Sequence, residues 1–475
     1  MDFHTEGETS MENFRNKVLE FVKENERNIV QDIKDICAIK SLLGPAEPNA
    51  PFGKENRECL DLALAMSRRL GLDAVDCEGY MGYAEVKGEK EEYIASIAHL
   101  DVVPEGNGWK GDPFVVREVD GWLIGRGVCD DKGPAVLTMY MLKFFKDNYE
   151  KLPYTLRALF GCEEETGMRD LEYYLENYPA PVFAFTPDAN FPVCCGEKGQ
   201  ASGDLVSAKI ENGNVVDFTA GVASNVIPDR ASITVKTNGK ALPAADGIEI
   251  TVDGETATMK AFGIGGHAAM PEGTKNAIGM LVNYCLDNGL LTAEEEVFFN
   301  MLRDLHASDY GEGMGVASDD GIFSPLTFIG GMMKIEDGCF VQNFNCRYPT
   351  SITGEEIEKI LAEKLASVGG TTKNIHTVKP FYVDKNSAPI QALLTAYNDA
   401  TGKNEEAYTI GGGTYARHFP AAAAFGVEPC ASETDYFPDF IGPVHGAEEG
   451  YDIKGFMKAL EILIIATARL MEIEF

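Results

Sequence analysis

The chain has 475 residues, of which 45% are hydrophobic and 24% are charged, and its 41 basic and 75 acidic residues leave a formal net charge of −34. A chain of this length exceeds what a single simple core usually organises, so we expect two domains. The acidic balance argues against a nucleic acid or an anionic membrane as the partner, because such partners are bound through basic surfaces.

Three further features indicate a soluble cytoplasmic protein. The first residues, 1–8, lack the basic and apolar regions of a signal peptide. The longest apolar stretch, near the C-terminus, is interrupted by Lys458, Glu461 and Arg469, so no membrane span is expected. The eleven cysteines show no framework spacing, which favours reduced thiols.

The first predicted elements are helices over residues 11–43 and 56–70, followed by a buried parallel strand over residues 93–98. This strand runs into His99 and Asp101. Residues two apart in an extended segment point the same way, so both side chains can share one cleft. Open α/β sheets place their active sites at such carboxyl ends of strands.

Two more apolar strands end in the same manner. Residues 155–161 run into a triple glutamate, 163–165, and residues 182–185 run into Asp188. Acidic residues also stabilise helix N-termini, so helix capping is the alternative explanation for the glutamates. The repetition of one pattern at three strand ends favours a metal site over capping.

A further pair of carboxylates, Asp130 and Asp131, opens a helix that extends through Asp147. Taken alone, this pair could form a solvated, salt-bridged turn with Arg126 and Lys132 on either side. Together with the three strand ends, it favours metal binding.

From about residue 197 the pattern changes to that of an α+β domain. Residues 202–262 read as antiparallel strands, helices are predicted over 276–287 and 355–366, and two strands flank Asp337-Gly338. Near residue 380 the chain should return to the first domain, because helices from Ala388 and Tyr451 are needed to cover its sheet.

The predicted fold class is therefore α/β. A catalytic domain with a mostly parallel central sheet, of the zinc-peptidase type, would carry an inserted α+β lid domain. The expected boundaries are residues 1–197 and 381–475 for the catalytic domain and residues 198–380 for the lid.

Five motifs occur in order along nearly the whole chain: HLDVVP at 99–104, GRG at 125–127 with DDKG at 130–133, EEET at 163–166, TPD at 186–188, and PVHG at 443–446. Together they resemble the di-metal aminoacylase/carboxypeptidase family of metallopeptidases, peptidase family M20. Within it, the segments FTPDANFP (185–192), GEKG (196–199) and GGGTYAR (411–417) are most similar to the bacterial PepV-type dipeptidases.

The resemblance implies a site with two divalent metal ions, for which zinc is expected and manganese and cobalt are alternatives. Histidines and carboxylates suit these ions, and the lack of cysteine ligands argues against a structural zinc. The implied ligands are His99 and Asp188 for one ion, Glu165 and His445 for the other, and Asp130 as the bridge.

The resemblance also implies how catalysis would proceed. Glu164 would be the general base, taking a proton from the attacking water and returning it to the leaving amine. Asp101 would accept a hydrogen bond from the far nitrogen of His99 and so fix its tautomer. One departure from the family pattern is Glu163, which stands where the family has aspartate, and the frame of residues 161–167 favours Glu164 as the base and Glu165 as the ligand.

Other residues of the matching motifs are implied substrate contacts. His267 would stabilise the tetrahedral oxyanion, although a plain loop histidine is the alternative. Asn225 would touch the substrate, and Arg347 would clamp its free α-carboxylate, with a surface salt bridge as the alternative. Tyr415 and Arg417 would line the pocket.

The function expected from the sequence is hydrolysis of unblocked dipeptides, Xaa-His or similar, by a monomer that binds neither nucleic acid nor membrane. An amidohydrolase acting on N-acyl amino acids uses the same chemistry and is the first alternative. A non-catalytic metal-binding or peptide-binding protein is the second, but such a protein would be expected to have lost the base or a ligand.

Overall fold

The computed structural model describes residues 8–427 and 438–475, so the first residues, on which the signal-peptide prediction rests, lie outside the described part. The chain forms two compact units. Unit 1 comprises the chain up to Cys195, Tyr382–Tyr408 and Gly413–Phe475, and unit 2 comprises Gly196–Phe381 and Thr409–Gly412. The chain thus changes unit after Cys195 and after Phe381, and the short return at Thr409–Gly412 was not predicted.

The main sheet of unit 1 has the strand order β1-β2-β6-β3-β7-β21-β8-β19, with β20 paired to β8. Its strands are β1 (Asp73–Cys77), β2 (Met81–Val86), β3 (Lys90–His99), β6 (Tyr154–Gly161), β7 (Phe183–Thr186), β8 (Cys194–Glu197), β19 (Phe381–Tyr382), β20 (Tyr408–Ile410) and β21 (Ala422–Ala424). The neighbours β6, β3, β7 and β21 are parallel, whereas β1, β2 and β6 pair antiparallel with one another in turn, as do β21 and β8. The sheet is therefore mixed rather than mostly parallel, because the unpredicted hairpin β1–β2 pairs antiparallel with β6.

The helices of unit 1 are α1 (Glu8–Cys37), α2 (Lys54–Arg69), α3 (Lys132–Asn148), α4 (Arg169–Asn177), α8 (Ala388–Thr401), α9 (Ile453–Leu470) and the short 3-10 helix η2 (Tyr415–His418). Helix α1 ends at Cys37, six residues before the predicted end. The chain beyond it is held by the sheet instead, since the Ser41 hydroxyl donates to the carbonyl of Leu100 at 2.6 Å.

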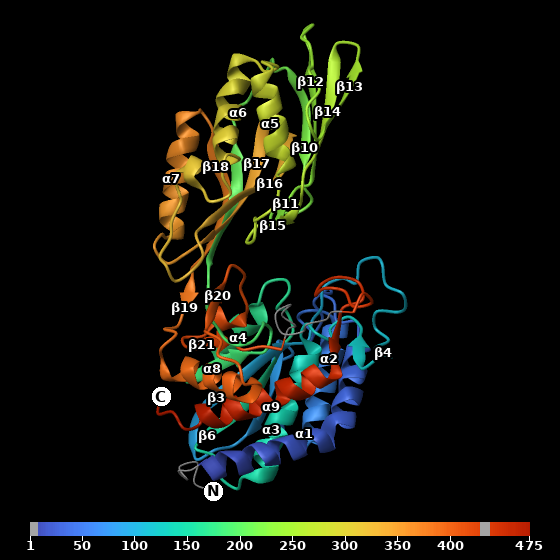
Figure 1. Ribbon diagram of the computed structural model, residues 1–475, viewed down its shortest axis with the longest axis vertical. Helices are drawn as coiled ribbons and strands as arrows, with labels where there is room; N and C mark the ends of the chain where they lie inside the picture. Colours follow the sequence, from blue (N-terminus) through green and yellow to red (C-terminus); the bar gives the residue numbers. More distant parts are fainter. Residues whose placement is uncertain (1–7, 428–437) are drawn as a thin grey trace. The chain divides into compact units, whose positions relative to one another are not determined.

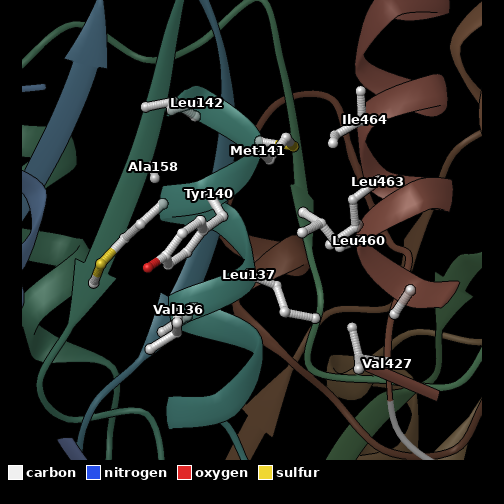
Figure 2. Packing of buried hydrophobic residues seen from close by; sticks show 14 of the residues in the cluster. Val136, Leu137, Tyr140, Met141, Leu142, Ala158, Val427, Leu460, Leu463 and Ile464 are labelled. Atoms are coloured by element: carbon white, nitrogen blue, oxygen red, sulfur yellow. The ribbon is translucent and has the colours of Figure 1, made fainter. Parts of the chain in front are cut away.

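Helix α3 is the centre of the hydrophobic core of unit 1. It contacts β2, β3 and β6 on one side and α1 and α9 on the other. Figure 2 shows Leu137 and Met141 of α3 facing Leu460 and Leu463 of α9. Because α3 is apolar and buried on nearly every side, close packing holds it in one position. Asp130 and Asp131 directly precede α3, so the same packing positions them.

Unit 2 is built on an antiparallel sheet of order β13-β14-β12-β10-β16-β17-β9-β18, on which helices α5, α6 and α7 pack (Figure 1). Its strands are β9 (Gly199–Val206), β10 (Val215–Ala220), β12 (Arg230–Lys236), β13 (Ile248–Asp253), β14 (Thr256–Phe262), β16 (Thr327–Glu336), β17 (Cys339–Tyr348) and β18 (Thr371–Val378). Its helices are α5 (Ala277–Asp287), α6 (Ala293–Leu305), α7 (Gly354–Ser367) and the 3-10 helix η1 (Glu312–Met314).

Two small sheets complete the fold. In unit 2, β11 (Val226–Ile227) pairs with β15 (Gly266–His267). In unit 1, β4 (Arg117–Val119), β5 (Trp122–Ile124) and β22 (Gly450–Asp452) form a three-stranded sheet. This second sheet brings the chain around residue 449 beside the loop that follows β5. Among the helices of the described residues, none combines the length and apolarity needed to cross a bilayer.

Candidate metal centre

Three adjacent parallel strands deliver side chains to one edge of the unit 1 sheet. His99 is the last residue of β3, Glu165 follows the end of β6, and Asp188 lies two residues beyond β7. Because β3 pairs with both β6 and β7 in parallel, the three strand ends meet at the same edge. The prediction that the side chains after these three strands lie close together is therefore confirmed.

Asp130 lies between the two histidines of this cluster. Its Oδ1 is 2.8 Å from Nε2 of His99, and its Oδ2 is 2.8 Å from Nε2 of His445. Each carboxylate oxygen thus faces a different imidazole, which is the arrangement expected of a carboxylate shared by two cations.

Two groups of donor atoms result, and both contain Asp130. Among the described residues, His99, Asp130 and Asp188 form one group and Asp130, Glu165 and His445 form the other, each with donor atoms within 4.8 Å of one another. Asp188 Oδ2 is 3.8 Å from His99 Nε2, and Glu165 Oε1 is 3.3 Å from His445 Nε2. The structure thus brings together all five residues expected as ligands.

The electrostatics of the cluster fit divalent cations. Burial, with Asp130 nearby, raises the pKa of Asp188 to about 7. Hydrogen bonds to Asp130 and Glu165 raise the pKa of His445 to about 11. Four carboxylates and two histidines are crowded together here, and such a group of carboxylates is costly without a compensating positive charge. Two divalent ions would supply that charge.

Asp101 offers His99 two acceptor atoms. Nδ1 of His99 is 3.0 Å from the backbone carbonyl oxygen of Asp101 and 3.4 Å from its carboxylate. Both acceptors favour the tautomer with the proton on Nδ1, which leaves Nε2 to face Asp130. The Asp101 carboxylate also accepts the backbone N–H groups of Glu164 and Glu165, at 3.0 and 3.1 Å.

The three consecutive glutamates have different surroundings. Glu163 is buried, and its carboxylate accepts hydrogen bonds from the Arg169 side chain at 2.8 Å, away from the donor groups. Glu165 contributes to a donor group. Glu164 stands between them, and burial beside Asp188 raises its pKa well above the usual range. Of the three glutamates, Glu165 is therefore the one that belongs to a donor group, and Glu164 is a buried carboxylate beside that group.

A buried ion pair that the sequence did not single out holds the loops of this site together. Glu449 and Arg126 are almost fully buried and bonded to each other. Oε1 of Glu449 accepts the backbone N–H groups of Gly127, Cys129 and Asp130 at 3.1 to 3.3 Å. Nη2 of Arg126 donates to the carbonyl of His445 at 3.1 Å. The GRG motif was the available signal for Arg126, whereas no pattern pointed to Glu449.

The alternative of a solvated turn at Asp130-Asp131 is wrong. Asp131 and Lys132 are completely buried. Oδ2 of Asp131 accepts the backbone N–H of His99 at 3.1 Å, and Nζ of Lys132 donates to the carbonyl of Ile39 at 2.6 Å. The charged side chains of Asp131 and Lys132 therefore form hydrogen bonds inside the protein and are not exposed to solvent.

Unit 2 contains three of the expected contact residues, Asn225, His267 and Arg347. His267 pairs with Val226 across β15 and β11, next to Asn225, whose carbonyl accepts the N–H of Ala268. Nδ1 of His267 accepts the N–H of Ala269 at 3.2 Å, which leaves Nε2 as the N–H donor. Burial and the charge of Arg347 lower the pKa of His267, which favours the neutral imidazole.

Arg347 is not a surface salt-bridge residue. It lies on β17 and is 7% exposed. Its Nε donates to Oδ1 of Asn345 at 3.0 Å, and its Nη1 donates to the carbonyl of Gly411 at 3.2 Å. These bonds hold the guanidinium in one orientation, which is what bidentate recognition of a carboxylate requires.

Tyr415 and Arg417, both on η2 in unit 1, have different surroundings. Tyr415 is completely buried, and its hydroxyl donates to Oδ2 of Asp170 at 2.5 Å. This position argues against the expected direct contact of Tyr415 with substrate. Arg417 is partly buried, and its guanidinium packs against Gly413. A side chain at position 413 would not fit without moving Arg417, because its Cβ would lie 2.4 Å from Cζ of Arg417.

The fold and the paired donor groups are those of a metal-dependent hydrolase, and comparison with known proteins identifies the class. The sequence profile described as Peptidase family M20/M25/M40 matches residues 95–469. The chain belongs to this family and is a metallopeptidase, a hydrolase acting on peptide bonds.

Similar proteins and structures agree with this assignment. A "Putative dipeptidase" of Staphylococcus aureus (strain USA300) is 30% identical over 431 residues, covering 86% of this chain and 91% of its own. Human carnosine dipeptidase 1 has a similar fold, with a TM-score of 0.55 at 15% identity over 97% of this chain and 100% of its own. The metallo-carboxypeptidase Sso-CP2 of Sulfolobus solfataricus gives a TM-score of 0.57 at 14% identity, covering 94% and 99%.

Proposed function

We propose that this protein is a di-metal dipeptidase that hydrolyses unblocked dipeptides. The observation that carries the proposal is the shared position of Asp130, whose two oxygens each lie 2.8 Å from the Nε2 of a different histidine. His99 and Asp188 would hold one ion and Glu165 and His445 the other, with Asp130 between them. Zinc suits this donor set, as do manganese and cobalt.

Two divalent ions in this site would polarise the scissile carbonyl and lower the pKa of a water molecule. The protein's own groups then perform the proton transfers. The Glu164 carboxylate accepts a proton from the attacking water and passes it to the nitrogen of the leaving amine. We propose that His267 donates its Nε2–H to the oxyanion that develops on the substrate.

Recognition of a free C-terminus is proposed for Arg347, whose orientation is set by Asn345 and Gly411. A guanidinium held in this way can bind a terminal carboxylate through two parallel hydrogen bonds. The buried Arg347 thus supports a preference for short peptides with a free α-carboxylate, and Arg347→Lys, which keeps the charge, should raise KM for Ala-Ala. Substrates of the Xaa-His type are the first to test.

The decisive comparison is between dipeptides and N-acyl amino acids. Protein stripped with a chelator and refilled with Zn²⁺, Mn²⁺ or Co²⁺ is assayed on Ala-Ala, β-Ala-His and N-acetyl amino acids. We expect activity only after refilling and a clear preference for the dipeptides. A preference for N-acetyl amino acids would instead identify an amidohydrolase with the same chemistry.

The general base is tested by Glu164→Gln, with Glu172→Gln on α4 as a control outside the donor groups. The E164Q protein should retain two metal ions per chain and lose at least about 100-fold in kcat, within the range that general base catalysis contributes. Full activity of E164Q would remove Glu164 from the mechanism. We also expect a monomer in solution, which light scattering on a sizing column can check.

A further inference from the structure

Four successive backbone N–H groups after β6 are all bound by two buried aspartates. The N–H groups of Cys162 and Glu163 donate to Oδ2 of Asp170 at 2.6 and 3.0 Å. Those of Glu164 and Glu165 donate to the Asp101 carboxylate. The backbone that carries Glu164 is thus held by two carboxylates, of which only Asp101 belongs to a motif recognised in the sequence.

Asp170 is itself held in place by Tyr415. The Tyr415 hydroxyl donates to the same Oδ2 at 2.5 Å, and Oδ1 of Asp170 accepts the N–H of Leu171 at 2.7 Å. Both side chains are fully buried. The phenol also lies against the end of β6, because a Cβ on Gly161 would come within 2.0 Å of the Tyr415 hydroxyl oxygen. The hydroxyl therefore has one partner and little room to move.

From this geometry we infer that Tyr415 and Asp170 are positioning residues for Glu164, acting through the loop backbone. The inference rests on the proposed function, in which Glu164 transfers the proton. Hydrogen bonds to a charged acceptor are shorter and stronger than neutral ones, so loss of the hydroxyl relaxes Asp170 and then the amides of Cys162 and Glu163. Small misplacements of a catalytic group lower rates steeply, by about 100-fold for 1 Å.

The test uses Tyr415→Phe, which removes one oxygen atom and keeps the ring. A matched control is available in the same unit. The Tyr140 hydroxyl donates to Oδ2 of Asp32 at 2.8 Å, and Asp32 also accepts a hydrogen bond from Arg69 rather than from the loop of Glu164. Tyr140→Phe therefore removes the same kind of buried bond without touching the Glu164 loop.

We expect Y415F to lower kcat on Ala-Ala by about 10-fold or more, with KM and the metal content unchanged. Y140F should stay within about twofold of the wild type in kcat while lowering the melting temperature as much as Y415F does. Equal kcat values for Y415F and Y140F would overturn the inference. Asp170→Asn serves as the second variant and should show the same kcat loss as Y415F.

A combination with the base variant separates this inference from the proposed function. In an E164Q background, Y415F should cause no further loss of the residual rate, because residues that act as a unit are not additive. An additive loss would show that Tyr415 acts elsewhere. A fully active E164Q protein would contradict the proposed base, whereas an inactive E164Q with a fully active Y415F would contradict only the positioning role.

Discussion

The ion pair of Arg126 and Glu449 provides the most demanding test of the site's architecture. Arg126→Met keeps much of the side chain's volume and removes its charge. Glu449 would then remain as a carboxylate that is 0% exposed and bonded only to the backbone N–H groups of Gly127, Cys129 and Asp130. Removing one partner of a buried pair in this way costs about 3–5 kcal/mol, a large part of the stability of a typical domain.

The same substitution should weaken metal binding. Arg126 donates to the carbonyl of His445, and Glu449 accepts the N–H of Asp130, so the pair joins the loop of His445 to the loop of Asp130, the proposed shared ligand. Residues that orient metal ligands typically contribute 10- to 100-fold to metal affinity. We expect a loss of this size for R126M in a competition titration with a chelator.

Stability can be read specifically in unit 1, because both tryptophans of the chain, Trp109 and Trp122, belong to it. Urea unfolding of the metal-free protein is followed by their fluorescence. Lys143→Met, which breaks the exposed pair with Asp147, is the control and should change the free energy of unfolding by less than about 0.5 kcal/mol.

A double variant makes the reasoning refutable. R126M combined with Glu449→Gln should cost less than the sum of the two single variants, because a neutral amide does not need the guanidinium. Strict additivity, or a loss below about 1 kcal/mol for R126M, would show that the pair does not hold these loops.

Three further predictions concern other parts of the chain. Leu463→Ala, in the fully buried contact between α9 and α3 (Figure 2), should lower the free energy of unfolding by about 2–5 kcal/mol without changing KM, as measured by urea unfolding and steady-state kinetics. Gly413→Ala should displace Arg417, lowering kcat/KM for dipeptides if Arg417 contacts the substrate while the melting temperature changes little. Burial lowers the pKa of His306 to about 4, below that of the unfolded chain, so its contribution to stability is lost as the pH falls from about 6.5 to 4. His306→Asn should flatten this acid dependence in circular dichroism melts, and an unchanged slope would contradict the assignment.

Local sequence patterns were sufficient to predict many of the helices and strands, because caps and hydrophobic periodicity depend only on residues close together in the chain. The apolar runs before His99, the triple glutamate and Asp188 correspond to β3, β6 and β7, each within a few residues of the predicted bounds. Helix α5 begins at Ala277 after the predicted start at Asn276, whose side chain accepts the N–H of Ile278. Such caps and periodicities act within one or two turns, so they can be read from adjacent residues.

Errors arose where distant segments decide the outcome. Helix α1 ends early because Ser41 binds the carbonyl of Leu100, and the sheet is mixed because a hairpin with weak alternation pairs with β6. Tyr415 was expected at the substrate but binds Asp170, which is 245 residues away in the chain. No pattern within a few residues contains such a contact.

The sequence by itself indicated His99, the glutamates and Asp188 as one cluster, because acidic or histidine residues after apolar strands are local features. Asp130 and His445 completed the proposed ligand set through the resemblance to the family. The sequence also placed Glu164 and Glu165 in one loop. Only the tertiary structure decided how these groups are held: the two oxygens of Asp130 face different histidines, and the buried carboxylates of Asp101, Asp170 and Glu449 bind the loop amides. A buried carboxylate must find donors wherever the fold supplies them, and that supply depends on contacts between segments far apart in the chain.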